Sequence, residues 1–467
     1  MAFSLFLESR KDDCKALVTA LRKHFDYVSI LGTDVKCKVL RSTRSVSNIG
    51  EGRDSECGFV LKMTSGKSFY EYSFDDVKDD VDDLVKKIIE ETKIHSSLVD
   101  KQINGAPVAD QPLVKDFVRE SDIHNYDDKT LMEFCAKIKD DVLAQSDKFV
   151  NAIAMLSIME VNKLFVSENK MLTQNYAWVN SYAIGVYRAG NKMVTPREGV
   201  NTNMLSEVFE NLPKKVEILL KKAENLAKAT PIEPGVYDVI THPSITGLIA
   251  HEAFGHGVEM DMFVKDRALA KSYVGKYVAS PITNMRDGAA SCYSVGSYFF
   301  DDDGVLAHDT QIIKDGILVA GISDLATAGV LGTEPTGNGR RESYKRKAYS
   351  RMTNTFFEKG SDKLEDMIAS IKHGYMLFET NNGMEDPKSW AIQCVAEYGI
   401  EIIDGKLTDH YVSPVVMSGY VPDLLKSISM ISDDFVVEGS GSCGKGYKEW
   451  VRVSDGGPAL KVRVKLG

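Results

Sequence analysis

The sequence lacks any apolar run approaching the roughly 18 residues that a membrane span requires. The apolar stretch at the start of the chain is short and is followed at once by acidic residues, so a secretory signal peptide is not expected. The seven cysteines are scattered and never have CxxC spacing, a pattern typical of free thiols in a reducing compartment. We therefore expect a cytoplasmic protein with no membrane association.

An excess of basic residues is also absent. The chain has 57 Lys and Arg against 67 Asp and Glu, which gives a net charge of −10. Nucleic-acid binding depends on Lys and Arg contacts to phosphates, so this balance argues against a nucleic-acid partner. A hydrophobic content of 43% and a length of 467 residues are instead typical of a globular protein with two or three domains.

The first half of the chain alternates helical and strand-like patterns. Apolar residues at helical spacing predict helices over 1–24, 73–91, 128–147 and 204–229. Alternating runs predict strands at 27–30, 35–39, 57–63, 150–158, 163–167 and 176–186. The polar, proline-containing interval 96–126 is interpreted as a linker or arm. The last helix has a side that we interpret as solvated, marked by Lys214, Lys215, Lys221 and Lys222.

A Pro- and Gly-containing break at 230–235 precedes a change in the residue pattern. Beyond it, Asx-Gly dipeptides recur between apolar runs at 287–288, 303–304, 315–316, 382–383, 404–405 and 455–456. Asx-Gly in this context is a strong hairpin signal, so the C-terminal region is predicted to be mostly antiparallel sheet, with a further helix near 362–373. The predicted fold class is α+β, with a mixed sheet and long helices in the N-terminal part and a mostly antiparallel C-terminal domain. The predicted divisions are an N-terminal α/β domain (1–95), the linker or arm (96–126), a middle α/β region (127–229) and a β-rich domain (230–467).

The segment His-Glu-Ala-Phe-Gly-His at 251–256 concentrates reactive groups on one predicted helix of the β-rich domain. It provides the imidazoles of His251 and His256 and the carboxylate of Glu252. Neutral imidazole is a good ligand for Zn2+, and a neighbouring carboxylate can act as a base toward water. The pattern indicates a hydrolase that cleaves amide bonds without a covalent intermediate, although a pair of core histidines is the plain alternative.

The spacing of the histidines is one residue longer than in the familiar zinc helix. Residues i and i+5 lie about 140° apart around an ideal α-helix, too far to share one ion comfortably. A π-bulge brings i+5 back over i, and Gly255 and Gly257 on either side of His256 make local unwinding easy. We therefore expect a distorted or ending helix at this motif.

A tetrahedral catalytic zinc site that keeps a water needs one more protein ligand. Cys443 stands out because it lies in the Gly-rich segment 439–446, whose backbone can approach an ion closely, although such a segment can equally be a flexible turn. The other cysteines stay open as candidates. So do several carboxylates and histidines, namely Glu259, Asp261, His242, His308, His373 and His410.

Several motifs resemble the TldD/PmbA family of proteins named as modulators of DNA gyrase and as peptide-maturation proteases, specifically its TldD-like, metal-binding branch. They are the segment 251–261 with both histidines, the segment 335–344 (Pro-Thr-Gly-Asn-Gly-Arg-Arg-Glu-Ser-Tyr), the segment 351–355 (Arg-Met-Thr-Asn-Thr) and Cys443-Gly444-Lys445. The motifs occur in family order and span nearly the whole C-terminal half. The acidic chain itself gives no support to a gyrase link.

The resemblance implies a zinc metallopeptidase with an HExxxH motif. By this resemblance, His251, His256 and Cys443 of this chain would bind Zn2+, and Glu252 would be the general base and later the proton donor. It also implies a cleft that takes unfolded or leader peptide in extended form by pairing to a sheet edge. The implied assembly is a homodimer or a heterodimer with a PmbA/TldE-like subunit. One departure is visible, because the family commonly follows Cys-Gly-Lys with an acidic or small residue and Gly-Gln, whereas this chain reads Gly446-Tyr447-Lys448.

Four further residues are candidates for roles beside the metal. Glu259 or Asp261 could hold a ligand histidine by its second ring nitrogen, and Arg340 or Arg341 could clamp a peptide carbonyl or carboxylate. Ordinary surface carboxylates and structural ion pairs are the respective alternatives. Two other functions also stay open at this point, a non-catalytic subunit of a peptidase complex and a metal amidase that acts on a small molecule.

Overall fold

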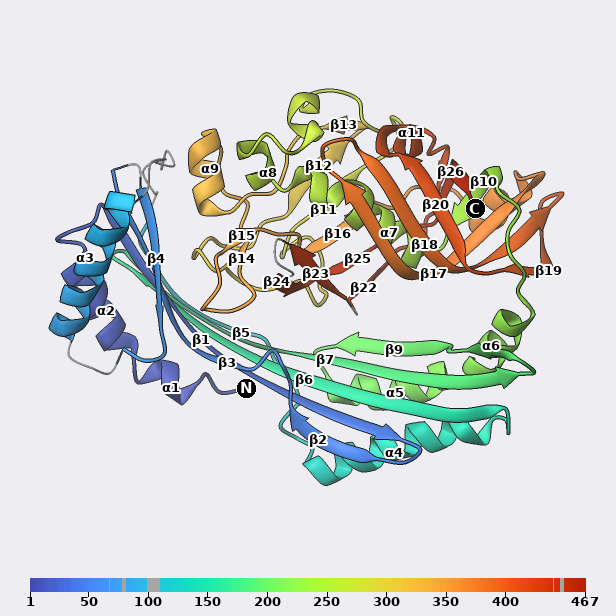
Figure 1. The fold of residues 1–467 in the computed structure, drawn as a ribbon, viewed down its shortest axis with the longest axis horizontal. Helices are drawn as coiled ribbons and strands as arrows, with labels where there is room; N and C mark the ends of the chain where they lie inside the picture. Colours follow the sequence, from blue (N-terminus) through green and yellow to red (C-terminus); the bar gives the residue numbers. More distant parts are fainter. Residues whose placement is uncertain (67, 78–80, 99–109, 440, 446–448) are drawn as a thin grey trace.

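The computed structural model describes residues 1–66, 68–77, 81–98, 110–439, 441–445 and 449–467. A nine-stranded sheet dominates the first half, with the order β4-β3-β1-β6-β7-β5 and with β2, β8 and β9 paired beside this path (Figure 1). The strands are β1 (Tyr27–Thr43), β2 (Ser47–Glu51), β3 (Glu56–Ser65), β4 (Ser68–Phe74), β5 (Leu113–Val118), β6 (Phe149–Ser167), β7 (Lys170–Ala189), β8 (Lys192–Val194) and β9 (Arg197–Thr202).

Helices cover this sheet in two places. Amphipathic α4 (Asp128–Ala144) and α5 (Leu205–Val216) pack apolar side chains against the central strands, and α6 (Leu219–Lys228) extends this layer. At the other end of the strands, α1 (Leu5–Glu8), α2 (Lys11–Leu21) and α3 (Val81–Leu98) enclose a separate core with β1 and β3 (Figure 1). The class is therefore α+β, as the sequence predicts.

Several predicted elements of this half are wrong in extent. The strands predicted at 27–30 and 35–39 are one strand, because the intervening Asp34 is buried and its carboxylate accepts a hydrogen bond from Ser4 Oγ at 2.6 Å. The predicted helix at 73–91 begins only at Val81, after β4 has ended at Phe74. The interval 96–126 contains β5, which pairs in parallel with β7, and residues 99–109 of that interval lie outside the described part of the chain.

The helix predicted over 204–229 is two helices, and a side chain explains the break. The Gln145 amide donates to the carbonyl of Val216 at 2.9 Å and accepts the N–H of Leu220 at 3.2 Å. It thereby replaces the intrahelical bond between those two residues, which is a known cause of helix interruption. The prediction that Lys222 lies on a solvated side is also wrong, since only 8% of this residue is exposed.

The C-terminal half is built on two sheets in which most pairs are antiparallel, as predicted. One has the order β10-β17-β18-β20-β26-β21 with β19 beside β18, and the other has the order β13-β12-β11-β16-β25-β22. The strands of the first sheet are β10 (Gly235–Thr241), β17 (His373–Asp386), β18 (Ala391–Ile403), β19 (Lys406–Val412), β20 (Val415–Tyr420), β21 (Met430–Ile431) and β26 (Leu460–Leu466). Those of the second are β11 (Met285–Asp287), β12 (Thr310–Lys314), β13 (Ile317–Leu318), β16 (Asn354–Phe357), β22 (Val436–Glu438) and β25 (Ser454–Gly457).

Two-stranded ribbons and short helices complete this half. The ribbons pair β14 (Gly339–Arg340) with β15 (Tyr349–Ser350) and β23 (Ser442–Lys445) with β24 (Glu449–Arg452). The helices are α7 (Pro243–Leu248), η1 (Ile249–Gly255), η2 (His256–Val258), α8 (Asp261–Val264), η3 (Leu269–Tyr273), α9 (Leu325–Leu331), α10 (Leu364–Ala369) and α11 (Val421–Lys426). None of the described helices has the length and apolar character needed to cross a membrane.

The Asx-Gly hairpin predictions divide according to backbone conformation. Asp315-Gly316 and Asp404-Gly405 join antiparallel strands, with φ values of 49° and 80° and of 47° and 75° that fit a two-residue hairpin turn. The hairpins predicted at 382–383 and 455–456 are wrong, because these dipeptides lie inside β17 and β25. A local turn signal is overridden there by pairing with neighbouring strands.

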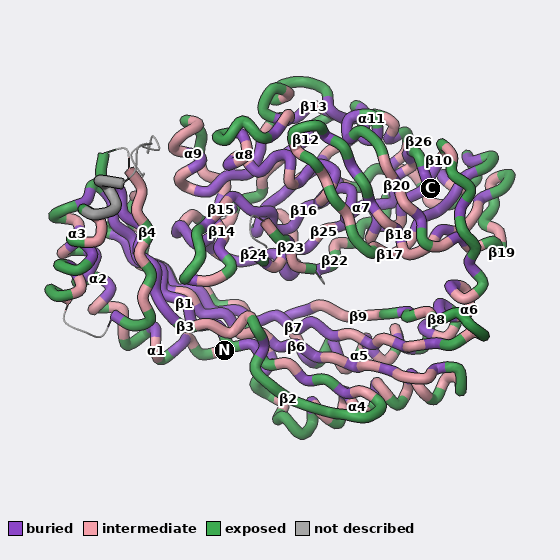
Figure 2. The backbone as a smooth tube through the Cα atoms, in the orientation of Figure 1, coloured by how far each residue is buried: buried purple, intermediate pink, exposed green. Residues whose placement is uncertain are grey.

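The two halves share buried contacts. The C-terminal half lies along the concave side of the long sheet (Figure 1). The central strands of that sheet, β1, β3, β6 and β7, are largely buried (Figure 2). Tyr176 and Trp178 of β7 pack with Val295 and Tyr298, and Phe165 of β6 packs with Phe300. These contacts fix the long sheet relative to residues 295–300 of the C-terminal half.

Candidate metal centre

The two histidines of the motif lie on the distorted helix that their spacing predicts. α7 begins at Pro243, whose missing N–H suits the first helical position, and continues directly into the π-helix η1. The chain then tightens into the 3₁₀ turn η2, which begins at His256. The ring centroids of His251 and His256 are 5.1 Å apart, so the wide turn brings the two imidazoles together.

Close packing explains why glycine occupies the end of this π-helix. A Cβ atom on Gly255 would lie 2.1 Å from the sulfur of Met352 and 3.0 Å from the carbonyl oxygen of Ala250. The backbone of η1 therefore sits directly on the buried Met352 side chain. On its other side, the Phe254 ring packs against Trp390, with centroids 6.0 Å apart and neither residue exposed.

Cys443 reaches the histidines from the other end of the C-terminal half. It lies on β23 opposite Val451 of β24, and its sulfur is 3.5 Å from Nε2 of His256. The buried guanidinium of Arg351 donates to the carbonyls of Cys443 at 2.6 Å and Glu449 at 3.1 Å, which ties both strands of the ribbon to one point. Gly446, Tyr447 and Lys448, which depart from the family pattern, lie outside the described residues.

The three groups fit one metal ion. A nitrogen of His251, a nitrogen of His256 and the sulfur of Cys443 all lie within 4.8 Å of one another. Imidazole nitrogen and thiolate sulfur are both ligands that Zn2+ prefers. In addition, Nδ1 of His251 is buried without a hydrogen-bond partner in the described structure, as expected for a nitrogen whose partner is not a protein atom. The donor set and its spacing therefore suit a zinc ion.

The electrostatics of the cluster favour the thiolate that a metal requires. Burial would raise the pKa of the Cys443 thiol, but the imidazoles of His256 and His251 outweigh burial and lower this pKa well below its ordinary value. Burial would lower the pKa of His251, yet the Cys443 thiolate raises it to about 8. The two imidazoles of the protein alone therefore favour the ionised form of the Cys443 thiol.

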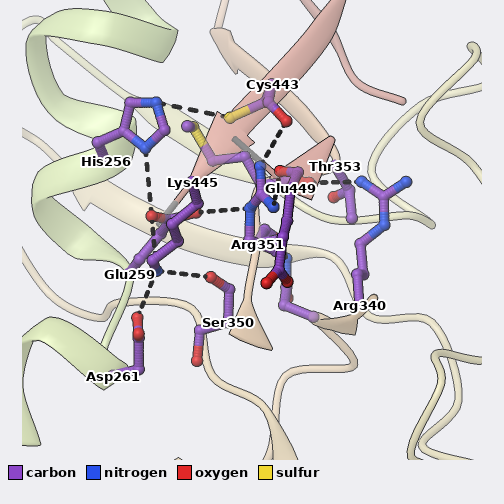
Figure 3. A network of polar contacts seen from close by, with 12 residues as sticks. His256, Glu259, Asp261, Arg340, Ser350, Arg351, Thr353, Cys443, Lys445 and Glu449 are labelled. Atoms are coloured by element: carbon purple, nitrogen blue, oxygen red, sulfur yellow. Dashed lines mark hydrogen bonds and ion pairs between the residues drawn. The ribbon is translucent and has the colours of Figure 1, made fainter. Parts of the chain in front are cut away.

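Behind His256 lies a buried network of charged groups (Figure 3). Glu259 accepts from Nδ1 of His256 at 3.2 Å and from the Lys445 ammonium at 2.9 Å, and its other oxygen is 3.6 Å from Nε of Arg351. Lys445 also donates to Asp261 at 2.6 Å and to the carbonyl of Ser350 at 3.1 Å. Of the two carboxylates predicted to hold a ligand histidine, Glu259 contacts His256, whereas Asp261 contacts lysines.

Glu252 points toward the same space from the π-helix. Its Oε2 is 4.0 Å from Nε2 of His256, and burial raises the pKa of its carboxyl. Gly383 of β17 lies against it, because a Cβ there would be 2.5 Å from Cγ of Glu252 and 3.0 Å from Cδ1 of Leu248. The absence of a side chain at Gly383 leaves room for the Glu252 carboxylate.

The remaining sequence candidates lie away from the three donor atoms. Arg340 donates to the carbonyl of Met352 at 2.7 Å and stacks over Tyr298, and the buried Arg341 pairs with Glu71 at 3.1 Å. Neither arginine lines the cleft at the histidines. Among the described residues, the donor group contains none of the other histidines considered as ligands, which are His242, His308, His373 and His410.

Sequence reasoning missed two carboxyl groups that line this cleft. Both carboxyl oxygens of Glu385 are buried without a hydrogen-bond partner in the described chain, and burial raises the pKa of Glu385 to about 8. Burial likewise raises the pKa of Asp455 to about 6. Glu385 follows the dipeptide 382–383, and Asp455 begins the dipeptide 455–456. The sequence predicts turns at both dipeptides, but both lie in strands that direct these carboxyl groups into the cleft.

The cleft has a volume of about 1010 Å³ and is walled by three segments of the chain. The segment of α7, η1 and the following turns forms one wall, residues 380–387 of β17 and its end form the second, and the Cys443 ribbon forms the third. β10 pairs with β17 only as far as Leu377. Within the described residues, no strand pairs with the rest of that side of β17, so a sheet edge borders the cleft.

Comparison with known proteins finds relatives of the C-terminal half and of the whole fold. Residues 234–465 match the family model of the PmbA/TldA metallopeptidase C-terminal domain. The chain is 32% identical over 331 residues to a metalloprotease of Synechocystis sp., covering 70% of this chain and 71% of that one. It is 32% identical over 286 residues to a zinc metalloprotease TldD homolog of Saccharolobus solfataricus, covering 60% and 63%. TldE from Thermococcus kodakarensis has a similar fold, with a TM-score of 0.75 and 18% identity over 97% of this chain and 100% of that chain.

The family-model and sequence matches define a hydrolase of the metallopeptidase class. More narrowly, the chain belongs to the PmbA/TldD family, since it covers more than two thirds of a relative that is 32% identical to it.

Proposed function

We propose that this protein is a zinc-dependent peptidase that cleaves unfolded or leader peptides, with His251, His256 and Cys443 as zinc ligands and Glu252 as the catalytic base. The observation that carries the proposal is the convergence of the three donor atoms within 4.8 Å beside the Glu252 carboxylate. When bound, zinc supplies a Lewis acid that activates water and polarises a carbonyl. The zinc in the name of the Saccharolobus solfataricus relative supports this choice of metal.

The chain's own groups supply the proton transfers and the orientation. Glu252, half-buried and free of any ion pair with Lys or Arg in the described structure, takes the proton of the attacking water and returns it to the leaving amine. Glu259 fixes the ring of His256 through Nδ1, so that Nε2 faces Cys443. A buried carboxylate in that position keeps the imidazole in one tautomer and one orientation.

The free edge of β17 supports an extended peptide as the substrate. Its backbone borders the cleft from Thr380 to Glu385, next to the carboxylate of Glu252. A peptide that pairs with this edge gains main-chain hydrogen bonds without regard to its sequence. This favours an unstructured polypeptide over a small amide, whose recognition needs a closed pocket with few convergent polar groups.

Location and assembly are part of the same proposal. All seven cysteines are free, which supports the cytoplasm as the compartment. The similarity of the fold to TldE supports a dimer, either of two copies or with a TldE-like subunit. The mass of the purified protein with and without such a subunit distinguishes the two assemblies.

Metal analysis tests the zinc centre directly. Purified wild-type protein should bind zinc and cleave an unstructured peptide, and chelation should remove the cleavage until zinc is returned. Cys443→Ser should weaken zinc binding by at least about 100-fold, because an oxygen replaces a charged sulfur ligand. Cys135→Ser, which changes a buried thiol in α4, is the control and should keep both properties. A chain that stays free of zinc in excess metal, yet supports an active partner, would instead be a non-catalytic subunit.

A methyl group at position 383 tests the position of Glu252. Gly383→Ala should lower kcat by about 10- to 100-fold, because the new Cβ would meet Cγ of Glu252 at 2.5 Å and displace its carboxylate. Zinc content should not change, since the donor atoms lie on other segments. Gly419→Ala on β20 is the matched control, because its Cβ meets nothing within 4 Å. Equal activity of both variants would argue against Glu252 as the base.

A further inference from the structure

Lys222 is a buried cation at the junction between the two halves of the molecule. It comes from α6, and its ammonium lies 3.2 Å from Glu198 of β9, 3.3 Å from Glu379 of β17 and 3.9 Å from Glu397 of β18. It also donates to the carbonyl of Arg197 at 3.0 Å, and its side chain is 7% exposed. One ammonium thus connects the long sheet to two strands of the C-terminal sheet.

The strand that Lys222 contacts is strained at the point of contact. Glu379 has a φ of 57°, in the left-handed region that a non-glycine residue rarely occupies. The register between β17 and β18 shifts between Thr380 and Asn382, which marks a β-bulge. Strain of this kind persists only where surrounding contacts impose it, and it often marks a functional segment.

Three contacts impose the bulge. Lys222 binds the Glu379 carboxylate, Ser244 of α7 accepts the N–H of Glu379 at 3.1 Å, and the Arg197 guanidinium donates to the carbonyl of Thr380 at 2.5 Å. Two of these contacts come from the long sheet and its helix α6, and the third comes from the helix that leads into the π-helix. The bulge is therefore held from outside the C-terminal sheet.

The segment after the bulge is the one that borders the cleft. Residues 380–385 of β17 line it, and Gly383 lies directly against Glu252. A bulge rotates the strand that follows it, so the conformation of Glu379 sets the direction in which this edge presents its N–H and carbonyl groups. Release of the bulge would turn the edge while leaving the metal ligands on their own segments.

We propose that Lys222 and Arg197 form a clamp that positions the free edge of β17 for an extended peptide substrate. Both are positioning residues, since neither lines the cleft. The inference rests on the proposed peptidase function and assigns to the N-terminal half a role in substrate binding. A long peptide that pairs along β17 depends on the clamp, whereas a short substrate that spans only the scissile bond does not.

Kinetics with long and short substrates test the clamp. In Lys222→Met, KM for an extended unstructured peptide should rise about tenfold, equivalent to about 1.4 kcal/mol, with zinc content within about twofold of wild type and with any change of kcat the same for the long and the short substrate. The short substrate should keep its KM. Arg197→Ala should give the same selective rise, and it serves if Lys222→Met does not fold. An equal rise of KM for both substrates, or no effect on KM, would overturn the clamp.

A rescue experiment separates positioning from simple stability. Glycine adopts a φ of 57° without strain. Adding Glu379→Gly to Lys222→Met should therefore return the KM for the long peptide most of the way to the wild-type value. Adding Glu397→Gln instead also removes one of the unpaired carboxylates, but should restore nothing, because Glu397 lies outside the bulge. Rescue by Glu397→Gln alone would mean that charge, not backbone conformation, explains the loss.

Amide hydrogen exchange keeps this inference distinct from the proposed function. Exchange at residues 379–385 should become at least about tenfold faster in Lys222→Met, while the π-helix and the Cys443 ribbon stay protected. If wild-type protein cleaves no peptide but this exchange pattern appears, the peptidase proposal fails and the clamp on β17 stands. If the exchange of β17 does not change, the clamp is wrong whatever the activity.

Discussion

Glu252→Gln is expected to lower kcat for peptide cleavage by about 10²- to 10⁴-fold while zinc content stays at the wild-type level. The amide is nearly the same size as the carboxylate, so it keeps the close packing against Gly383. It cannot accept a proton from water, so the variant retains the metal centre but lacks the base. Single-turnover rates and metal analysis of the same preparation are the measurements that check this.

A neighbouring carboxyl group provides the matched control. Glu385 lines the same cleft, and its buried oxygens lack hydrogen-bond partners in the described chain. Glu385→Gln should reduce kcat far less than Glu252→Gln, because burial raises the pKa of Glu385 to about 8 and keeps it mostly protonated near neutral pH. A zinc-replete Glu252→Gln variant with full activity, or a much larger loss in Glu385→Gln, would assign the base elsewhere.

The sequence predicts the local geometry of the site well where the chemistry is local. Histidines at i and i+5 with glycine beside them predict a distorted or ending helix, and residues 249–255 form a π-helix. This inference needed only helix geometry and the assumption that the two imidazoles share a purpose. The hairpins at 315–316 and 404–405 were equally local, because two residues with positive φ determine the turn.

Features that depend on long-range contacts could not be predicted in this way. The residues next to Lys222 in the sequence are typical of a solvated helix side, yet glutamates from three strands surround its ammonium in the fold. Glu385 and Asp455 follow or occupy turn-like dipeptides, but pairing with neighbouring strands keeps the chain extended and aims both carboxyl groups at the cleft. Cys443 approaches His256 across 187 positions of the sequence, and this contact was likewise predicted from the family resemblance and not from residue spacing.

Glu259→Ala is expected to destabilise the protein by about 3–5 kcal/mol and to weaken zinc binding by about 10- to 100-fold. The side chain is 1% exposed, and its loss leaves the ammonium of Lys445 and the guanidinium of Arg351 buried without this partner. It also frees the ring of His256, whose Nδ1 then has no acceptor at 3.2 Å. Denaturant unfolding of the metal-free protein and a zinc competition titration measure the two effects separately.

Controls that share only one of these contacts separate the two effects. Asp261 also accepts from Lys445 but does not contact His256, so Asp261→Asn should lose some stability and keep its zinc affinity. Glu259→Ala with Lys445→Met should recover part of the stability, because the orphaned ammonium is gone, without recovering zinc affinity. Zinc binding by Glu259→Ala as tight as wild type would mean that the ribbon and the π-helix alone orient His256.

The same carboxylate should also make stability depend on acid. Burial would raise the pKa of Glu259, but Lys445 and His256 outweigh burial and hold it below the ordinary value of 4.5. A depressed folded-state pKa contributes stability that is complete above the unfolded value and is lost as the pH falls through the folded one. Below about pH 4.5 the wild-type free energy of unfolding should therefore fall more steeply than that of Glu259→Ala. Parallel slopes would mean that the pKa of Glu259 in the folded protein is not depressed, and that Lys445 and His256 do not outweigh its burial.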